Sequence, residues 1–180
     1  PTGVVKMLDT FESSVGHFTN SPAYSGSTTG ISTASTALRD CAMRKNGNCS
    51  LQVKLVDNTA TSANWAVRLL SGGGTPSANT SLSRANGKVG FWVYSGGTGL
   101  SAALGIDDSD GTERSITRAI PANTWTYLEW SLADANQWNA WVGGNGAITA
   151  GTVTLDAIWL FRDQTAYNVF VYLDDVQIKN

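Results

Sequence analysis

The sequence Lys-Val-Gly-Phe-Trp-Val-Tyr, residues 88–94, alternates its side chains with a period of two. Successive side chains of a β-strand point to opposite faces, so the two valines and Phe91 share one face of this segment. Trp92 and Tyr94 point to the other face. The segment is therefore predicted to be a strand with an aliphatic side toward a hydrophobic core and an aromatic side directed away from it.

The same period of two recurs along the whole chain, between runs of turn residues. Glycine-rich runs such as residues 71–76, 95–99 and 143–146 supply the positive φ angles that tight turns require. The segments predicted to be strands are Val4–Leu8, Leu51–Leu55, Trp65–Leu70, Lys88–Tyr94, Ala102–Ile106, Trp125–Trp130, Ala157–Phe161 and Val169–Ile178. No helical periodicity, internal repeat or linker interrupts them. The sequence therefore predicts an all-β fold, an antiparallel two-sheet β-sandwich of jelly-roll type, with residues 1–180 as a single domain.

The composition excludes several classes of partner. With 180 residues, 42% hydrophobic and 14% charged, the chain is long enough and apolar enough for a full core. Its net charge is −2, and the basic residues are scattered apart from the pair Arg44-Lys45, so no nucleic acid partner is expected. No apolar run approaches the roughly 20 residues that cross a bilayer, so no membrane partner is expected either. We expect a monomer.

The two cysteines, Cys41 and Cys49, bracket the sequence Ala-Met-Arg-Lys-Asn-Gly-Asn. A segment with Gly and Asn at this length can fold back as a hairpin tip, and a disulfide closing it would stabilise the fold by about 2.5 kcal/mol. Such a bond predicts an oxidising, extracellular location, and hence a secreted protein. The alternatives are two free thiols or a metal site, although the single histidine, His17, lies far away in sequence.

Several predicted strands carry aromatic residues on the side away from the aliphatic one. Exposed aromatic side chains gathered on a sheet mark a binding surface. The flat apolar face of a sugar ring stacks on aromatic rings, and its hydroxyls need polar groups around them. We expect Arg68 and Gln52 to supply such hydrogen bonds. The residues predicted to form the platform, on one sheet, are Trp92, Tyr94, Trp159 and Tyr172.

A second candidate for sugar contact is the polar, tryptophan-rich segment Trp130–Trp141. Its Trp138 and Trp141 stand among Asp, Asn and Gln residues, a composition that favours a loop at the edge of a cleft. By contrast, Trp65 and Trp125 are expected to be structural, because tryptophan is well buried on average.

Catalytic motifs are not found in the sequence. There is no nucleophile elbow, zinc-binding His-Glu-x-x-His or phosphate loop. His17 is interpreted as a surface or packing residue. Asp107, Asp108, Asp110 and Glu113 surround a glycine in a turn, which resembles part of a calcium loop without its full ligand spacing. We therefore expect a binding protein and not an enzyme; the catalytic alternative is a small glycan lyase or hydrolase.

The two ends of the chain carry the most informative motifs. Leu8–Glu12 reads Leu-Asp-Thr-Phe-Glu, Gly16–Phe18 reads Gly-His-Phe, and Val171–Val176 reads Val-Tyr-Leu-Asp-Asp-Val. Together with Gly47–Leu55 and Gly90–Tyr94, these motifs resemble jelly-roll (galactose-binding-like) carbohydrate-binding modules of families 4, 11, 16 and 22. Members of that group begin with a Phe-Glu and Gly-aromatic segment and close with an aromatic-aliphatic-Asp-Asp-Val strand.

The resemblance implies a structural calcium ion that joins the first and last strands. Glu12 and Asp174 match the family's side-chain ligands, with Asp175 and Asp9 as less favoured candidates, and backbone carbonyls complete the site. Two neighbouring carboxylates repel each other, and a hard dication with oxygen ligands removes that repulsion. The alternative is an exposed Asp pair that protects an edge strand from aggregation.

The resemblance also implies a function. It predicts a non-catalytic module that binds polysaccharide and targets an attached secreted enzyme to it, with catalysis in another domain of a longer chain. Plant cell-wall β-glucan or xylan is the favoured target. The alternative of a different class is a structural or adhesion domain of a surface protein, which keeps the same sandwich without a sugar site.

Overall fold

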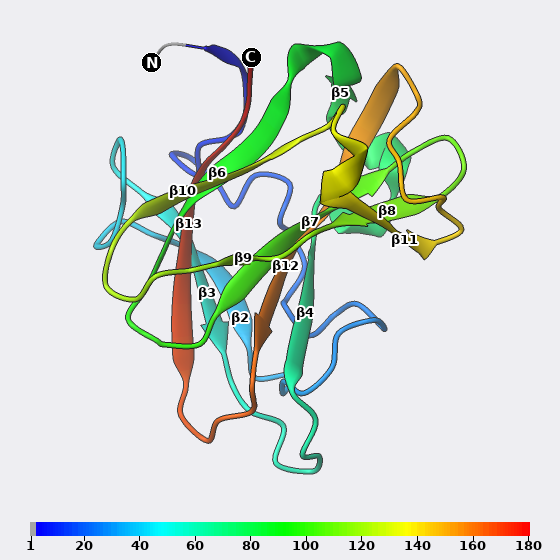
Figure 1. Cartoon of the computed structure of the whole chain (residues 1–180). Coiled ribbons are helices and arrows are strands. Elements are labelled where there is room, and N and C mark those ends of the chain that lie inside the picture. Colours follow the sequence, from blue (N-terminus) through cyan, green and yellow to red (C-terminus); the bar gives the residue numbers. More distant parts are fainter. Residues whose placement is uncertain (1–2) are drawn as a thin grey trace.

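The computed structural model describes residues 3–180, apart from the side chain of Asn86. Two antiparallel sheets pack face to face, as Figure 1 shows. The all-β sandwich of jelly-roll type predicted from the period-two alternation is confirmed. Within the described residues, no helix is long and apolar enough to cross a membrane.

Sheet A has the strand order β10–β6–β13–β3–β2, and β1 pairs with β13 beside it. Its strands are β1 (Val4–Asp9), β2 (Thr36–Asp40), β3 (Ser50–Leu55), β6 (Lys88–Ser95), β10 (Thr126–Ser131) and β13 (Val169–Lys179). The first and last strands lie side by side, with Val4 opposite Lys179 (Figure 1). The predicted strand at residues 88–94 therefore lies inside sheet A, between β10 and β13.

Sheet B has the strand order β11–β8–β7–β12–β4, with β5 added along β12 and β9 along β7. Its strands are β4 (Trp65–Leu70), β5 (Ser81–Ser83), β7 (Ser101–Asp107), β8 (Thr112–Ser115), β9 (Arg118–Ala119), β11 (Trp138–Val142) and β12 (Thr152–Arg162). Short 3₁₀ turns punctuate the connections: η1 (Gly72–Gly74), η2 (Pro76–Ala78), η3 (Arg84–Asn86) and η4 (Ala135–Gln137).

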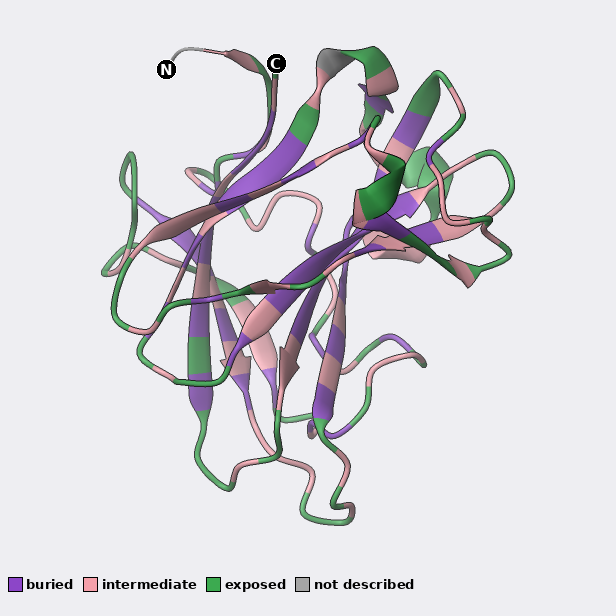
Figure 2. Cartoon of the chain, viewed as in Figure 1, coloured by how far each residue is buried: buried purple, intermediate pink, exposed green. Residues whose placement is uncertain are grey.

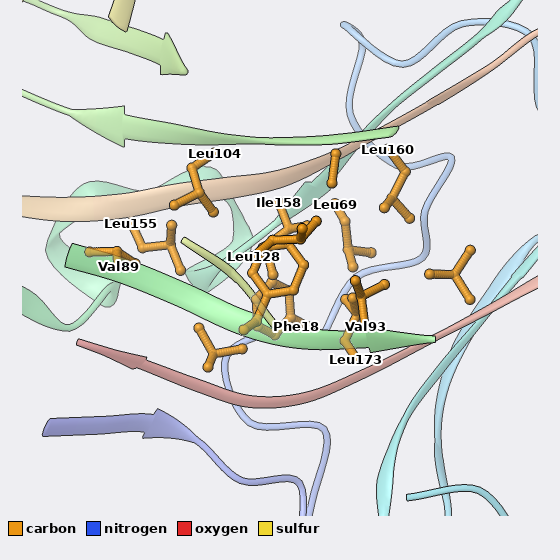
Figure 3. Packing of buried hydrophobic residues seen from close by; sticks show 14 of the residues in the cluster. Phe18, Leu69, Val89, Val93, Leu104, Leu128, Leu155, Ile158, Leu160 and Leu173 are labelled. Atoms are coloured by element: carbon orange, nitrogen blue, oxygen red, sulfur yellow. The ribbon is translucent and has the colours of Figure 1, made fainter. Parts of the chain in front are cut away.

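The core lies between the sheets and contains the aliphatic side of each predicted strand. Figure 3 shows Val93 and Leu173 of sheet A packed with Leu104, Ile158 and Leu160 of sheet B. Buried positions accordingly alternate along the strands and give way to exposed residues in the loops (Figure 2). The hydrophobic effect on these side chains holds the sheets together and leaves their outer faces free for other uses.

Each of the eight predicted segments is a strand, but several other strands were not predicted. The interpretation of Trp130–Trp141 as a loop was wrong at both ends, because β10 continues to Ser131 and β11 begins at Trp138. In β11 only Trp138 is buried, and the strand pairs with β8 alone. An edge strand of this kind has no regular hydrophobic alternation, so its pattern resembles that of a loop.

Candidate functional site

The predicted aromatic platform is divided between opposite sides of the molecule. Trp92 and Tyr94 of β6 and Tyr172 of β13 lie on the outer face of sheet A. Trp159 of β12 and Arg68 of β4 lie on the outer face of sheet B. The expectation of one platform was therefore wrong. Alternation tells which side of a strand a residue occupies, but it does not tell to which sheet the strand belongs.

On sheet A, an aromatic row runs from Trp125, just before β10, across β6 and β13. The ring centroid of Tyr94 lies 5.7 Å from that of Trp125 and 6.3 Å from that of Tyr172. Gln52 of β3 extends the row, because its Nε2 donates to the Tyr172 hydroxyl at 3.1 Å. Trp125, expected to be structural, is half-buried at one end of this row.

Two further aromatic rings of sheet A are covered by lysines. Trp92 and Tyr127 lie 5.5 Å apart, centroid to centroid. Lys45 Nζ lies 4.4 Å from the Trp92 ring and Lys179 Nζ lies 3.9 Å from the Tyr127 ring. Burial raises the pKa of Tyr127, and the negative charge of Glu129 adds to that rise. The lysine side chains cover ring faces that a ligand would otherwise reach.

On sheet B, three aromatic side chains form one cluster, with Trp159 at its centre. Phe161 stacks on Trp159 with centroids 5.7 Å apart and ring planes 3° from parallel. Trp141 meets the same ring edge-on at 5.1 Å. Trp159 is only 2% exposed, so it supports the cluster, while Trp141 and Phe161 keep half-buried surfaces toward solvent.

The contacts of Trp141 show that the outer face of sheet B is concave. Arg68 Cζ lies 4.7 Å from the centre of the Trp141 ring, although β12, β7 and β8 separate their strands. In a flat sheet, strands spaced about 4.8 Å apart would place these two strands about 19 Å apart. The sheet must therefore curve. A register shift between Ala140 and Val142 marks a bulge that redirects the Trp141 side chain.

We call this concave surface the sheet B trough and define it by Arg68, Arg114, Trp141, Trp159 and Phe161. Its floor is β7, which presents Ser101, Ala103 and Gly105 outward. A Cβ atom at Gly105 would lie 2.8 Å from Asp156 Oδ2 and 3.4 Å from Trp159 Nε1, so glycine permits their close approach.

One polar atom of the trough has an unused hydrogen-bonding capacity. Trp159 Nε1 is buried, and it finds no acceptor within the described part of the chain. A buried N–H without a partner costs free energy, so such an atom in a native fold needs an explanation. The atom packs against the backbone of β7, since a Cβ atom at Gly105 would lie 3.4 Å from it.

A carboxylate on the neighbouring strand, β12, holds Arg68 in place. Its Nε donates to Asp156 Oδ2 at 3.0 Å and its Nη2 to Asp156 Oδ1 at 2.6 Å, a two-point ion pair with Asp156 only 1% exposed. Two parallel bonds fix the plane of the guanidinium. Burial, followed by the charge of Asp156, raises the pKa of nearby Asp107.

The β7–β12 strand pair that floors the trough leads into a hollow at each end. A hollow of about 490 Å³ borders Asp107, Thr112 and Thr154 at one end. A second, of about 330 Å³, borders Ser101 and Phe161 at the other. The register pairs Asp107 with Thr154 and Ser101 with Phe161, so the two hollows lie at opposite ends of the same strands. An extended ligand would follow this line.

The tryptophans predicted for the second candidate have opposite roles. Trp138 is 4% exposed, belongs to the core and donates from Nε1 to the Ser131 carbonyl at 2.8 Å. The prediction that it contacts ligand was wrong, because its side chain is buried between the sheets. Trp141, in contrast, lies in the trough. Trp65, expected to be structural, is 2% exposed and donates to Asp57.

The predicted disulfide between Cys41 and Cys49 is confirmed, and two carboxylates hold the loop that it closes. Glu12 accepts the backbone N–H groups of Asn48 at 3.0 Å and Cys49 at 3.2 Å. Asp174 accepts those of Lys45 at 2.8 Å and Asn46 at 3.1 Å. The N–H bonds from Cys49 and then Asn48 lower the pKa of Glu12. These two predicted calcium ligands thus anchor a loop.

The calcium set implied by the resemblance also needs backbone carbonyls, and those nearest Glu12 are in use. Arg39 Nε donates to the Phe11 carbonyl at 3.0 Å, and Arg39 Nη2 donates to the Glu12 carbonyl. Asp175 accepts from the Asn46 side chain at 2.6 Å. A guanidinium therefore already supplies the positive charge beside Glu12. The residues as arranged do not fit a calcium ion at this position.

A different acidic group could hold a metal ion. Asp108, Asp110 and Glu113 each offer a carboxylate oxygen within 4.8 Å of the others. Two of them also anchor a loop: Asp108 accepts the N–H groups of Thr149 and Ala150 at 2.8 and 2.9 Å. Glu113 likewise binds the N–H groups of residues 145 and 146, each at 2.8 Å.

His17 links two side chains in an order that resembles a hydrolytic triad. Its Nδ1 lies 3.0 Å from the Asp9 carboxylate, and its Nε2 lies 3.0 Å from the Thr80 hydroxyl. Burial raises the pKa of Asp9, and the bonds to His17 oppose that rise. His17 and Thr80 are both half-buried. We interpret the arrangement as packing of the loop that follows β1.

Sequence reasoning missed three members of the trough region: Arg114, Asp156 and Phe161 as a ring partner of Trp159. Arg114 lies in β8, whose first residue was assigned to a turn. Asp156 lies at a register shift between Leu155 and Ala157, where strict alternation assigns the wrong face. Phe161 stands two positions after Trp159, so the alternation of the predicted strand placed both rings on one face and could have predicted their contact.

No family model matches this sequence, and no curated protein matches it. Solved structures match its fold. The carbohydrate-binding module TmCBM61, in complex with beta-1,4-galactotriose, matches with a TM-score of 0.52 and 12% identity over 100% of both chains. The family 11 module of the cellulase Lic26A-Cel5E of Clostridium thermocellum matches with 0.51 and 15% identity over 100% of this chain and 96% of that one.

A third structure, from a study of promiscuous carbohydrate-binding modules of the β-sandwich superfamily, matches with a TM-score of 0.55 and 9% identity. The match covers 97% of this chain and 62% of that chain. At such identities the likeness concerns the fold. The chain has the jelly-roll β-sandwich of carbohydrate-binding modules, so the resemblance predicted from its terminal motifs is confirmed at that level.

Proposed function

We propose that this chain is a non-catalytic carbohydrate-binding module and that polysaccharide lies in the sheet B trough. The observation that carries the proposal is the approach of Trp141 to both Trp159 and Arg68 from across the sheet. It produces a curved aromatic surface with a fixed guanidinium and a carboxylate beside it. Because ligand sites are concave, mostly apolar and lined by a few placed polar groups, the trough meets the physical requirements.

The chemistry of the trough suits sugar rings. Trp141 and Phe161 offer apolar faces for the C–H side of a pyranose. Arg68 is preorganised by its ion pair with buried Asp156, so it binds a hydroxyl group at little further cost in conformational entropy. Cations contact aromatic rings on both sheets, so the choice of sheet B rests on the approach of Trp141 to Arg68 from across the sheet.

The target, the attached domain, the monomeric state and secretion are proposed from the resemblance to carbohydrate-binding modules. We propose β-glucan or xylan as the target, an attached catalytic domain in a longer chain, a monomeric state and secretion. The disulfide supports an oxidising compartment. Among proteins of the same fold, one binds beta-1,4-galactotriose and another belongs to a cellulase. A calcium ion at Glu12, Asp174 and Asp175 stays a prediction of the resemblance, against which the Arg39 contacts weigh.

Affinity electrophoresis tests the proposal. Native gels containing β-glucan, xylan, galactan or pectin compare the wild type with Trp141→Ala, and with Trp92→Ala as a matched tryptophan change on sheet A. We expect at least one polysaccharide to retard the wild type. Trp141→Ala should weaken that binding about tenfold or more, since aromatic anchors dominate such interfaces. Trp92→Ala should bind like the wild type.

Two results would contradict the proposal. Loss of retardation in Trp92→Ala but not in Trp141→Ala would place the site on sheet A. No retardation of a folded wild type on any polysaccharide would favour the structural or adhesion domain. Circular dichroism of each variant verifies that the fold is intact.

A further inference from the structure

Arg114 is stacked on the aromatic cluster of the trough. It lies on β8, and its Cζ is 4.9 Å from the Trp159 ring centre and 5.4 Å from that of Phe161. The side chain is half-buried, and burial lowers its pKa. Contact with two nearly parallel rings positions the guanidinium group and leaves its edge, which carries the N–H donors, available for a ligand.

Arg114 differs from Arg68 in having no counter-ion. Among the ion pairs found within the described residues, Arg68 pairs with Asp156, but none includes Arg114. Its guanidinium also donates no hydrogen bond to another described residue. The acidic neighbours are engaged elsewhere: Glu113 holds its own loop, and Asp107 accepts the hydroxyls of Thr112 and Thr154.

A half-buried guanidinium without a counter-ion within the protein can bind the negative charge of a ligand. The hydroxyl groups of a neutral sugar accept single hydrogen bonds and leave the charge uncompensated. A carboxylate is planar, accepts two parallel N–H bonds from a guanidinium and neutralises it.

We propose that the trough recognises a uronic acid residue within its polysaccharide, with Arg114 binding the carboxylate while Trp141 and Phe161 contact the sugar rings. The inference rests on the proposed function and narrows its substrate class to acidic polysaccharides. Arg114 thereby becomes a specificity-determining residue, distinct from Arg68, whose charge is already satisfied within the protein.

The test uses pairs of probes that differ in the carboxylate alone. Isothermal titration compares glucuronoxylan and polygalacturonate with the same polymers after reduction of their carboxyl groups to alcohols. We expect wild-type protein to bind at least one acidic polymer about tenfold more tightly than its reduced form, the gain typical of a charge-assisted contact. Arg114→Gln should bind both forms equally, and Arg114→Lys should keep part of the preference. Lys54→Gln, a matched charge removal on sheet A, should behave like the wild type.

Each remaining outcome would overturn the inference. Equal wild-type affinity for acidic and reduced polymers, or an Arg114→Gln variant that keeps the preference, excludes carboxylate recognition by Arg114. Sulfated xylan that binds as tightly as glucuronoxylan would show a response to negative charge in general. Binding to neutral β-glucan without binding to either acidic polymer overturns the inference alone, whereas no binding to any polysaccharide overturns the proposed function as well.

Discussion

Trp138 and Trp141 stand three positions apart and illustrate how strongly the fate of a residue depends on backbone detail. Both are tryptophans in a polar segment, yet one is packed in the core and the other lies in the trough. Positions three apart in a strand point to opposite faces, and this separates the two rings once β11 begins at Trp138. Residue type alone thus predicted a site in this segment, but the strand decides which of the two rings can contact a ligand.

The acidic residues share a second feature at this scale. Glu12, Asp108, Glu113 and Asp174 each accept the backbone N–H groups of two consecutive loop residues. Gly47 belongs to this arrangement, because a Cβ atom there would lie 2.4 Å from Glu12 Oε1. Clustered N–H groups of this kind bind anions. The carboxylates are thereby taken up by loop anchoring and not by acid–base chemistry.

This anchoring predicts a pH dependence for Glu12. Bonds from the Cys49 and Asn48 N–H groups lower its pKa below the ordinary value of 4.5. A carboxyl group whose pKa is lower in the folded than in the unfolded protein stabilises the fold above its ordinary pKa. That stabilisation is lost as the pH falls through the lowered pKa. We expect Glu12→Gln to reduce the melting temperature at pH 7 and to differ less and less from the wild type below about pH 4.

Thermal melts at pH 7, 4.5 and 3 measure this difference. Asp163→Asn serves as the control, since Asp163 is an exposed acid on another loop. A gap between wild type and Glu12→Gln that stays constant across the range would show that the carboxylate charge plays no part in holding the loop.

At the scale of elements, the sequence predicted the strands with a regular period of two and missed those without it. β6 and β13 have one buried and one outward side, and their alternation is plain. β2 and β11 are edge strands whose burial does not alternate, and β8 was partly assigned to a turn. The core was therefore predictable in detail. The trough was not, because β8 and β11 form one of its sides.

The first and last strands are joined by direct pairing and by charged side chains. They pair directly, and Arg39, Glu12 and Asp174 connect the loops beside them. We therefore expect the melting temperature to be the same with EDTA and with added calcium, and to fall in Arg39→Gln. A loss of stability in EDTA that persists in Asp110→Asn would contradict this description. A loss abolished by Asp110→Asn would instead locate a metal ion at the Asp108, Asp110 and Glu113 group.

At the scale of the whole molecule, the sandwich presents two aromatic faces. The sequence predicted outward aromatic residues correctly but placed them on one sheet, since assignment of strands to sheets depends on long-range pairing. Sheet A carries a row of rings and two further rings that lysines cover, and sheet B carries the curved trough. The curvature is a property of the whole sheet, so no short sequence motif predicts it.

The central claim is that sugar binds in the trough, and the tryptophan indole N–H signals in an NMR titration test it most directly. The chain has seven tryptophans, and both outer faces carry some of them. On addition of an oligosaccharide from the polysaccharide that retards the protein most, we expect the Trp141 and Trp159 indole signals to shift. The Trp92 and Trp125 signals should stay in place. Shifts confined to Trp92 and Trp125 would contradict the claim.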